Sequence, residues 1–272
     1  MRNSEFQTIV AEIEGALGRL TLNRPDRLNA ISPLMLREIA AAAHWFDASP
    51  DLRVVIVCGA GRAFTAGADL NNSPLTGAAD GSPRSWMERR ETAQLGRRAA
   101  DALEEMRALT IVKLHGYIVG GGVVLASACD FRIAADDAIF SIPEIDLGIP
   151  LTWGAIPRLV RDIGPVMTKE LVITCRRFGA IEAKSIGFIN RTVPSAQLDG
   201  EVDTLAKELL AKPSVPSIIT KEHVNAVARA IGGTSFADVD TLLIAATEEE
   251  SRAVARSYVE RTLRKKTSKP KS

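Results

Sequence analysis

Hydrophobic positions in the first 150 residues alternate between short apolar runs, typical of strands, and longer mixed segments, typical of helices. Val54–Val57 is an unbroken β-branched run, which predicts a strand buried on both faces. Ser32 followed by Pro33 predicts a helix start, with the helix over Leu34–Phe46. By the same criteria we expect strands at 17–22, 111–114, 131–134 and 139–142, and helices at 86–109 and 123–128.

Beyond residue 150 the pattern predicts helices only, over 165–174, 181–185, 198–212, 217–230 and 238–263. Alternating strands and helices followed by helices alone indicate an α/β body with a helical C-terminal part. Asn71–Pro83 contains Gly, Pro, Asn and Asp without periodicity, so we expect a mobile loop there. The Ala63–Leu70 segment is expected to be a small-residue loop that enters a helix.

Composition excludes several classes of protein. The 272 residues carry 34 Lys and Arg against 33 Asp and Glu, a net charge of +1, which argues against nucleic-acid binding by bulk charge. Hydrophobic residues at 46% argue against disorder. The longest uncharged stretch, Leu114–Cys129, is too short and glycine-rich to span a membrane. Without a visible signal peptide, the isolated Cys58, Cys129 and Cys175 predict reduced thiols in a cytoplasmic protein. The basic tail at 261–271 is interpreted as a solvated helix end.

A glycine-rich turn separates an expected strand from an expected helix at Gly120–Gly122. Glycines there serve either tight packing or the close approach of backbone N–H groups to a ligand. A dinucleotide site would place a third glycine at position 125, where Leu125 stands, and an acidic residue at the end of the next strand, which reads FRIA. We therefore reject a dinucleotide-binding interpretation.

Two further segments carry candidate chemistry. Ala63–Leu70 (AFTAGADL) is a packing loop when taken alone; together with the glycine turn it forms two loops, each able to direct one N–H at one oxygen, as an oxyanion hole requires. In Ser141–Pro150 (SIPEIDLGIP), Glu144 stands among apolar residues. It is either a capping or surface residue or a desolvated general base, and the pattern leaves both open.

Taken together, these segments resemble the crotonase superfamily, the enoyl-CoA hydratase/isomerase family. The resemblance covers about residues 5–200 in order and spacing, and it extends to further motifs: NRPDRLNAI at 23–31, HGYIVGGGVVLASACDFRIA at 115–134, IPEIDLGIP at 142–150, IPRLVRDIG at 156–164 and AIEAKSIGFINRTV at 180–193.

The resemblance implies an α/β fold, a crotonase-type spiral of ββα units over residues 1–200, with a helical region over 201–272 that serves trimerisation and as a lid. It implies an acyl-CoA substrate, with coenzyme A as part of that substrate and no separate cofactor or metal. It also implies a homotrimer or a dimer of trimers, with neither nucleic acid nor membrane as a partner.

The resemblance also implies the site. Glu144 is the catalytic base, and the N–H groups of Ala68 and Gly121 are the oxyanion donors. The remaining implied positions bind substrate; they are Ala66, Asp69, Leu70, Arg27, Leu28, Gly120, Val124, Thr152 and Trp153.

This chain departs from the family's hydratase pattern at the second acid. Hydratases of the family use two glutamates around a water; Glu144 matches one, and Val124 stands at the other. Thr152 and Trp153 replace small, mostly glycine, positions that help to hold that water. These departures favour an enoyl-CoA isomerase with one carboxylate. Hydration by a single Glu, thioester hydrolysis, decarboxylation and non-catalytic acyl-CoA binding remain alternatives, and Asp146 is either a second acid or, as we expect, a loop or helix cap.

Overall fold

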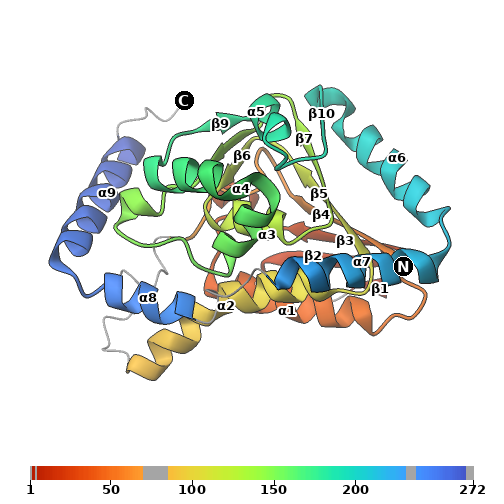
Figure 1. The fold of residues 1–272 in the computed structure, drawn as a ribbon, viewed down its shortest axis with the longest axis horizontal. Helices are drawn as coiled ribbons and strands as arrows, with labels where there is room; N and C mark the ends of the chain where they lie inside the picture. The colour runs from red at the N-terminus through yellow and green to blue at the C-terminus, as the bar shows by residue number, and fades with distance from the viewer. Residues whose placement is uncertain (1, 4, 70–84, 231–236, 268–272) are drawn as a thin grey trace.

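The computed structural model describes residues 2–3, 5–69, 85–230 and 237–267. The chain forms a mixed α/β fold around a seven-stranded sheet of order β1-β2-β3-β4-β5-β7-β10, in which the strands from β3 onward are parallel (Figure 1). These strands are β1 (Arg2–Asn3), β2 (Ile9–Glu14), β3 (Leu17–Leu22), β4 (Val54–Gly59), β5 (Leu109–Leu114), β7 (Phe131–Ala135) and β10 (Arg191–Val193).

The central strand β4 is buried along its whole length, as its apolar run predicts. Because side chains alternate across a strand, Val55 and Val57 join the main core on one face, whereas Val54 and Ile56 face the other side. That second face is covered by helix α6 (Leu198–Leu210). The continuous apolar sequence therefore reflects a sheet covered on both faces.

A second, separate sheet has three strands in the order β6-β8-β9. Its strands are β6 (Tyr117–Val119), β8 (Ile139–Ser141) and β9 (Phe178–Gly179). Isolated parallel bridges join Ile31 to Ala68 and Thr65 to Ile118 in the same direction. Successive turns of chain thus add one strand to the large sheet and one extended segment to the second layer. This is the repeated ββα spiral that the family resemblance implies.

Several predicted elements form as expected. Helix α1 (Pro33–Asp47) begins at Ser32, whose hydroxyl accepts a hydrogen bond from the Met35 N–H at 3.2 Å. Strand β3 has the predicted bounds, and the predicted helices at 181–185, 198–212 and 217–230 correspond to α5 (Ala180–Ser185), α6 and α7 (Ser214–Arg229). Cys58 and Cys129 are buried free thiols, as expected, whereas Cys175 is also free but only half-buried.

Some predicted bounds are wrong for identifiable reasons. Helix α2 (Trp86–Glu105) ends before residue 109 because Met106 is extended, and β5 begins at Leu109. Helix α4 (Ala155–Thr174) starts well before residue 165; Gly164, with φ 74° and ψ 165°, breaks it internally, so the sequence pattern revealed only its second half. The single helix expected over 238–263 is two helices, α8 (Asp238–Ala245) and α9 (Glu249–Thr267).

Three other expectations also need correction. Strands β9 and β10 contradict the expectation of helices alone beyond residue 150. The segment from Ala63 enters no helix within the described residues; it runs to Asp69 with bends at Phe64 and Gly67, held by the two bridges. Leu70 and the Asn71–Pro83 loop lie outside the described residues. Strand β2 is absent from the sequence-based expectation, although its burial alternates along the strand.

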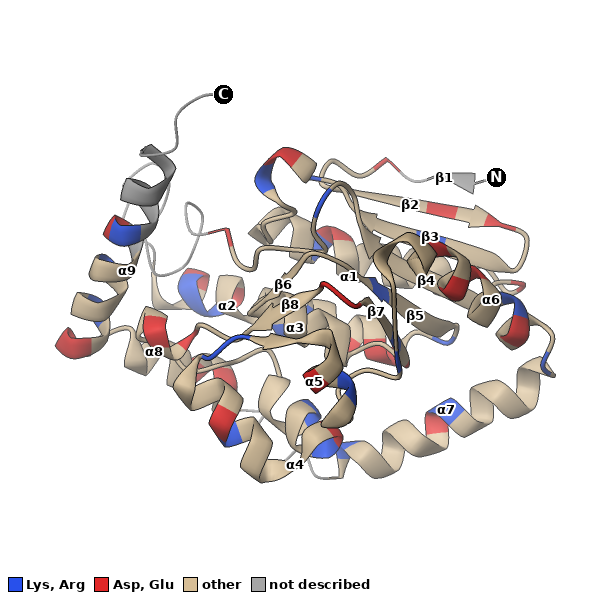
Figure 2. Ribbon diagram, turned by 90° about the horizontal axis from the view of Figure 1, so that it is seen from above, with Lys and Arg blue, Asp and Glu red and all other residues tan. Residues whose placement is uncertain are grey.

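The C-terminal helices occupy different sides of the molecule. Figure 1 shows α6 and α9 at opposite ends, with α8 near the start of α2. Acidic and basic residues are interspersed over the helices (Figure 2), in keeping with the near-zero net charge. No helix in the described part of the chain has the length and apolar composition needed to cross a membrane.

Candidate active site

A cavity of about 140 Å³ lies where the small-residue loop, the glycine turn and the turn bearing Glu144 converge. Most of the predicted site residues line it, namely Ala66, Ala68, Asp69, Gly120, Gly121, Val124, Glu144, Thr152 and Trp153. Arg27 and Leu28 do not line it, and Leu70 lies outside the described residues. The fold therefore brings together residues from three separate motifs around one largely apolar space.

The small-residue loop bends at Gly67, where φ is 90°, and backbone hydrogen bonds to Ile31 hold it on both sides of Ala68. The Ile31 N–H donates to the Gly67 carbonyl at 2.8 Å, and the Asp69 N–H donates to the Ile31 carbonyl at 2.9 Å. In this parallel bridge Ile31 pairs with the peptide groups on either side of Ala68. The Ala68 N–H itself therefore has no acceptor among the described residues. Ala68 lies in the cavity wall, so its N–H is available for a ligand oxygen.

The glycine turn leads into α3 (Gly121–Ser127). Gly120 has φ 51° and ψ −114°, a conformation that disfavours side chains, and its N–H donates to the Ser141 carbonyl at 2.9 Å. A methyl group on Gly120 would lie only 2.5 Å from Glu144 Oε1, so the glycine is what allows the carboxyl group to approach the turn. Gly121 begins α3, where an N–H has no intrahelical acceptor, and it also lines the cavity.

Glu144 follows β8 and precedes the 3-10 turn Ile145–Leu147 (η3). Its side chain makes no capping hydrogen bond, and Oε2 is buried without a hydrogen-bond partner among the described residues. Burial disfavours the charged form and raises the pKa of Glu144 to about 7. Such a carboxyl group exchanges a proton readily near neutral pH, as a general acid or base must. Asp146, by contrast, is exposed and does not line the cavity.

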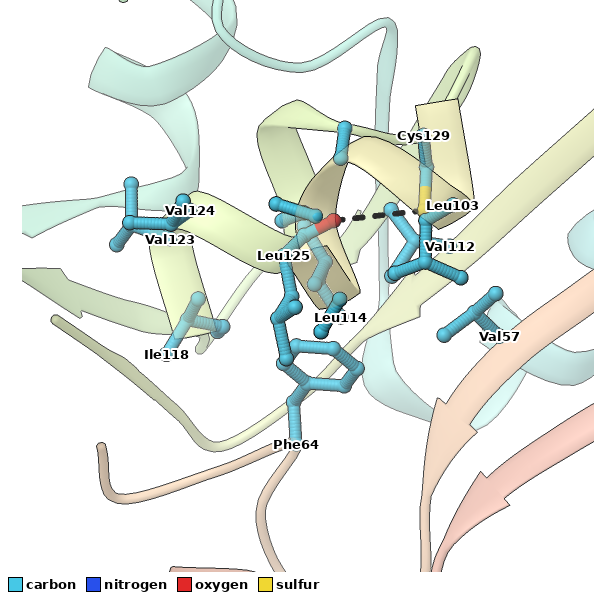
Figure 3. Close-up of a cluster of buried hydrophobic side chains, with 14 of the residues drawn as sticks. Val57, Phe64, Leu103, Val112, Leu114, Ile118, Val123, Val124, Leu125 and Cys129 are labelled. Atoms are coloured by element: carbon cyan, nitrogen blue, oxygen red, sulfur yellow. Dashed lines mark hydrogen bonds between the residues drawn. The ribbon is translucent and has the colours of Figure 1, made fainter. Parts of the chain in front are cut away.

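Val124 lies on α3 in the cavity wall, one turn from the glycines, and is almost completely buried. Figure 3 shows it on the apolar helix whose Leu125 carbonyl accepts a hydrogen bond from the Cys129 thiol. Its side chain offers no polar atom. Besides Glu144, the acid in the described lining is Asp69, which is buried and forms an ion pair with Arg24 at 2.9 Å.

The sequence analysis expected a lid from the C-terminal region but named none of the residues that its helices contribute to this cavity. Leu242 of α8 and Tyr258 of α9 both line it. Helix α9 approaches the Glu144 turn at Gly148, where φ is 72° and a methyl group would lie 2.4 Å from the Ser251 carbonyl oxygen. Burial raises the pKa of Tyr258, and the nearby carboxylates add to the rise. No local motif marks these positions.

Further lining residues were not named as site positions in the sequence analysis. Those from α2 and from the turn after η3 are Thr92, Ala93, Ile149, Pro150 and Leu151, with Ile31, Pro33, Leu36, Val119, Pro143 and Leu147 around them. Within the described ranges, no cluster of three or more His, Cys, Asp or Glu side chains is arranged to hold a metal ion. The arrangement thus offers one desolvated carboxyl group, unpaired backbone donors and an apolar pocket.

Comparisons with known proteins give a consistent result. Residues 12–267 match the family model described as enoyl-CoA hydratase/isomerase. A probable enoyl-CoA hydratase of Mycobacterium bovis is 36% identical over 220 residues, covering 81% of this chain and 82% of that protein. A peroxisomal Delta(3,5)-Delta(2,4)-dienoyl-CoA isomerase of Arabidopsis thaliana is 36% identical over 225 residues, covering 79% and 80%. The crystal structure of an enoyl-CoA hydratase from Mycobacterium avium subsp. paratuberculosis superimposes with a TM-score of 0.83 at 22% identity, covering 94% and 97%, and it shows the same fold.

Proposed function

The chain belongs to the enoyl-CoA hydratase/isomerase family, and from this premise we propose that Glu144 is its single catalytic base, acting on an acyl-CoA thioester. The N–H groups of Ala68 and Gly121 hold the thioester oxygen when it becomes an enolate. The observation that carries the proposal is the buried, unpartnered Glu144 Oε2 in a cavity that both N–H donors line.

The energetics support this division of roles. The α-proton of a thioester is only weakly acidic, so its removal needs stabilisation of the enolate oxygen. Loss of one N–H donor of this kind costs about 10²–10³ in rate in a hydrolase. A positioned carboxyl group with a pKa close to the working pH contributes about 10²–10⁴, and the pKa of Glu144 is raised to about 7.

A shift of the double bond is the reaction that one carboxylate can complete alone. Glu144 takes a proton from the carbon next to the thioester carbonyl, and the electron pair spreads over the dienolate. The same carboxyl group returns the proton to the far carbon, so that the double bond moves and no water is consumed. Val124 supports this choice because it cannot carry a proton at the position where hydratases of the family have a second glutamate.

Hydration is the second candidate, supported by the relatives named as hydratases at the same level of identity as the dienoyl-CoA isomerase. In that reaction Glu144 activates water for attack on the double bond and later returns a proton to the neighbouring carbon. Asp69 does not replace the missing second acid in this scheme, because Arg24 pairs with it.

The test is to incubate the purified protein with 2-enoyl-CoA and 3-enoyl-CoA esters, to separate the products by chromatography against standards of both isomers, and to weigh them by mass spectrometry. Double-bond migration without a change in mass supports the isomerase, and a gain of one water supports the hydratase. Release of free CoA or carbon dioxide would overturn both in favour of a hydrolase or decarboxylase. Tight binding without turnover across the panel would indicate a non-catalytic acyl-CoA-binding protein.

Glu144→Gln then tests the assigned base. We expect it to abolish turnover while acyl-CoA binding is retained. Asp146→Asn is a matched control in the same turn, because Asp146 is exposed and outside the cavity lining. A fully active Glu144→Gln variant would refute the assignment.

A further inference from the structure

Trp153 fills the space between α2 and the start of α3 at one wall of the cavity. A methyl group on Gly96 of α2 would lie 1.9 Å from the indole atoms Cδ2 and Cε2, and one on Gly121 would lie 2.3 Å from Cζ3. Because an alanine at either position would overlap the ring, the indole packs directly on both backbones. Trp153 also lines the cavity, so the ring separates the cavity from Gly96.

The backbone of Trp153 is held in a conformation that costs free energy. Its φ of 65° is left-handed, which disfavours a non-glycine residue by about 1–2 kcal/mol. The Arg158 guanidinium donates from Nη1 to the carbonyl of Trp153 at 3.1 Å and to that of Gly154 at 3.3 Å. The Gly154 N–H donates to Asp238 Oδ2 of α8 at 2.7 Å.

The Arg158 side chain that holds this turn is itself fixed in the protein interior. Arg158 is buried and forms an ion pair with Glu104 of α2 at 2.6 Å. The backbone that carries the ring is therefore held by charged groups from α2, α4 and α8. Strained residues that the surrounding structure holds in place concentrate at functional sites, which directs attention to what this indole does in the cavity.

We propose that Trp153, seated on Gly96, is the specificity-determining wall of the acyl pocket and restricts the protein to short acyl groups. This inference rests on the proposed function and adds the substrate class to it. The cavity bounded by the described residues, about 140 Å³, is close to the roughly 150 Å³ of an engineered cavity that binds benzene; because the thioester must also be seated there, it suits a short acyl group. The ring edge lies against Gly121, which places the wall beside the proposed oxyanion donor.

Trp153→Ala tests the wall by opening the cavity toward Gly96. The assay measures kcat/KM for straight-chain enoyl-CoA esters of about four to about twelve carbons. We expect the ratio of kcat/KM for long to short esters to rise at least about tenfold, because each methylene admitted to an apolar pocket is worth roughly 10–200-fold. The ratio is the readout, since loss of the ring beside Gly121 lowers turnover of every ester.

A second variant tests the contact with Gly96. In Gly96→Ala with Trp153→Ala, the new methyl group has no ring to overlap and takes back part of the opened space, so the long-to-short ratio falls again. Trp86→Ala is the matched control: Trp86 is the first residue of α2, is half exposed and does not line the cavity. Its ratio is expected to equal that of the wild type.

An unchanged ratio in a folded Trp153→Ala protein would overturn the inference while the proposed function stands. If that variant does not fold, the wild-type profile decides, because equal kcat/KM for the longest and shortest esters is incompatible with a closed wall. A wild type that neither binds nor turns over any ester refutes the proposed function, and this inference with it.

Discussion

Replacing Glu144 with Gln keeps the shape of the side chain and removes its ionisation, so it tests activity and stability together. Burial raises the pKa of Glu144 from the ordinary 4.5 to about 7. Each pH unit between the pKa values of the unfolded and folded states corresponds to about 1.4 kcal/mol of folding free energy. Ionising Glu144 inside the folded protein therefore costs about 3 kcal/mol, which the Gln variant does not incur.

The direction in which pH changes stability follows from the pH at which Glu144 binds its proton in the folded and in the unfolded state. Below about pH 4.5 the Glu144 carboxyl group is protonated in both states, and its contribution to stability is fully present. Between about pH 4.5 and 7 the unfolded chain is ionised while the folded chain is not, so the contribution is lost as the pH rises. Above about pH 7 the loss is complete, and we expect the Gln variant to have gained about 3 kcal/mol relative to the wild type.

The assay is urea unfolding of both proteins at equal concentration, at several pH values across this window, with turnover of an enoyl-CoA ester measured in parallel. Equal concentration matters because any oligomer would make stability depend on it. We expect turnover to fall by about 10²–10⁴ while stability above pH 7 rises. Asp146→Asn is the matched control, because it makes the same acid-to-amide change in the same turn at an exposed position. A stability difference between wild type and Glu144→Gln that does not change with pH would refute the reasoning.

Three further outcomes follow from the same geometry. Activity that depends on ionised Glu144 is expected to fall as the pH drops below about 7, and a pH profile of kcat/KM measures this. Gly120→Ala places a methyl group 2.5 Å from Glu144 Oε1, so we expect at least about a tenfold loss in kcat. Arg24→Gln removes the 2.9 Å ion-pair partner of the buried Asp69 carboxylate and is expected to cost about 1–3 kcal/mol by urea unfolding. Arg27→Gln, 4.0 Å from the same carboxylate and exposed, is expected to cost less than about 1 kcal/mol.

A specific result would contradict each of the predictions for the pH profile, Gly120→Ala and the arginine variants. A pH profile that is flat from pH 5 to 9 is incompatible with a base of this pKa. Gly179→Ala is the control for Gly120→Ala, because its φ is −95° and nothing lies within 4 Å of the added methyl group. Equal losses of kcat in these two variants would show that the effect is not the approach to Glu144. Equal losses of stability in the two arginine variants would show that burial of the ion pair does not matter.

Local sequence determined the elements whose signals are complete within a few residues. The β-branched run at Val54–Val57 specified a strand covered on both faces, and Ser32-Pro33 specified the start of α1. The glycine turn and the AFTAGADL loop marked backbone that approaches the cavity, because glycine and small residues leave N–H groups accessible there. The motif pattern, through the family resemblance, likewise pointed to Glu144.

Tertiary structure decided what depends on neighbours distant along the chain. The same SIPEIDLGIP segment suits a surface carboxylate or a buried one, and only packing of the glycine turn around Glu144 removes water and raises its pKa. Trp153, in the turn before α4, meets Gly96 of α2, and Tyr258 reaches the cavity from α9. Desolvation and pocket shape are sums over such long-range contacts, whereas strand and helix preferences arise within a few residues. Single elements were therefore predictable from local sequence, the spiral only through the family resemblance, and the contact of Trp153 with Gly96 not at all.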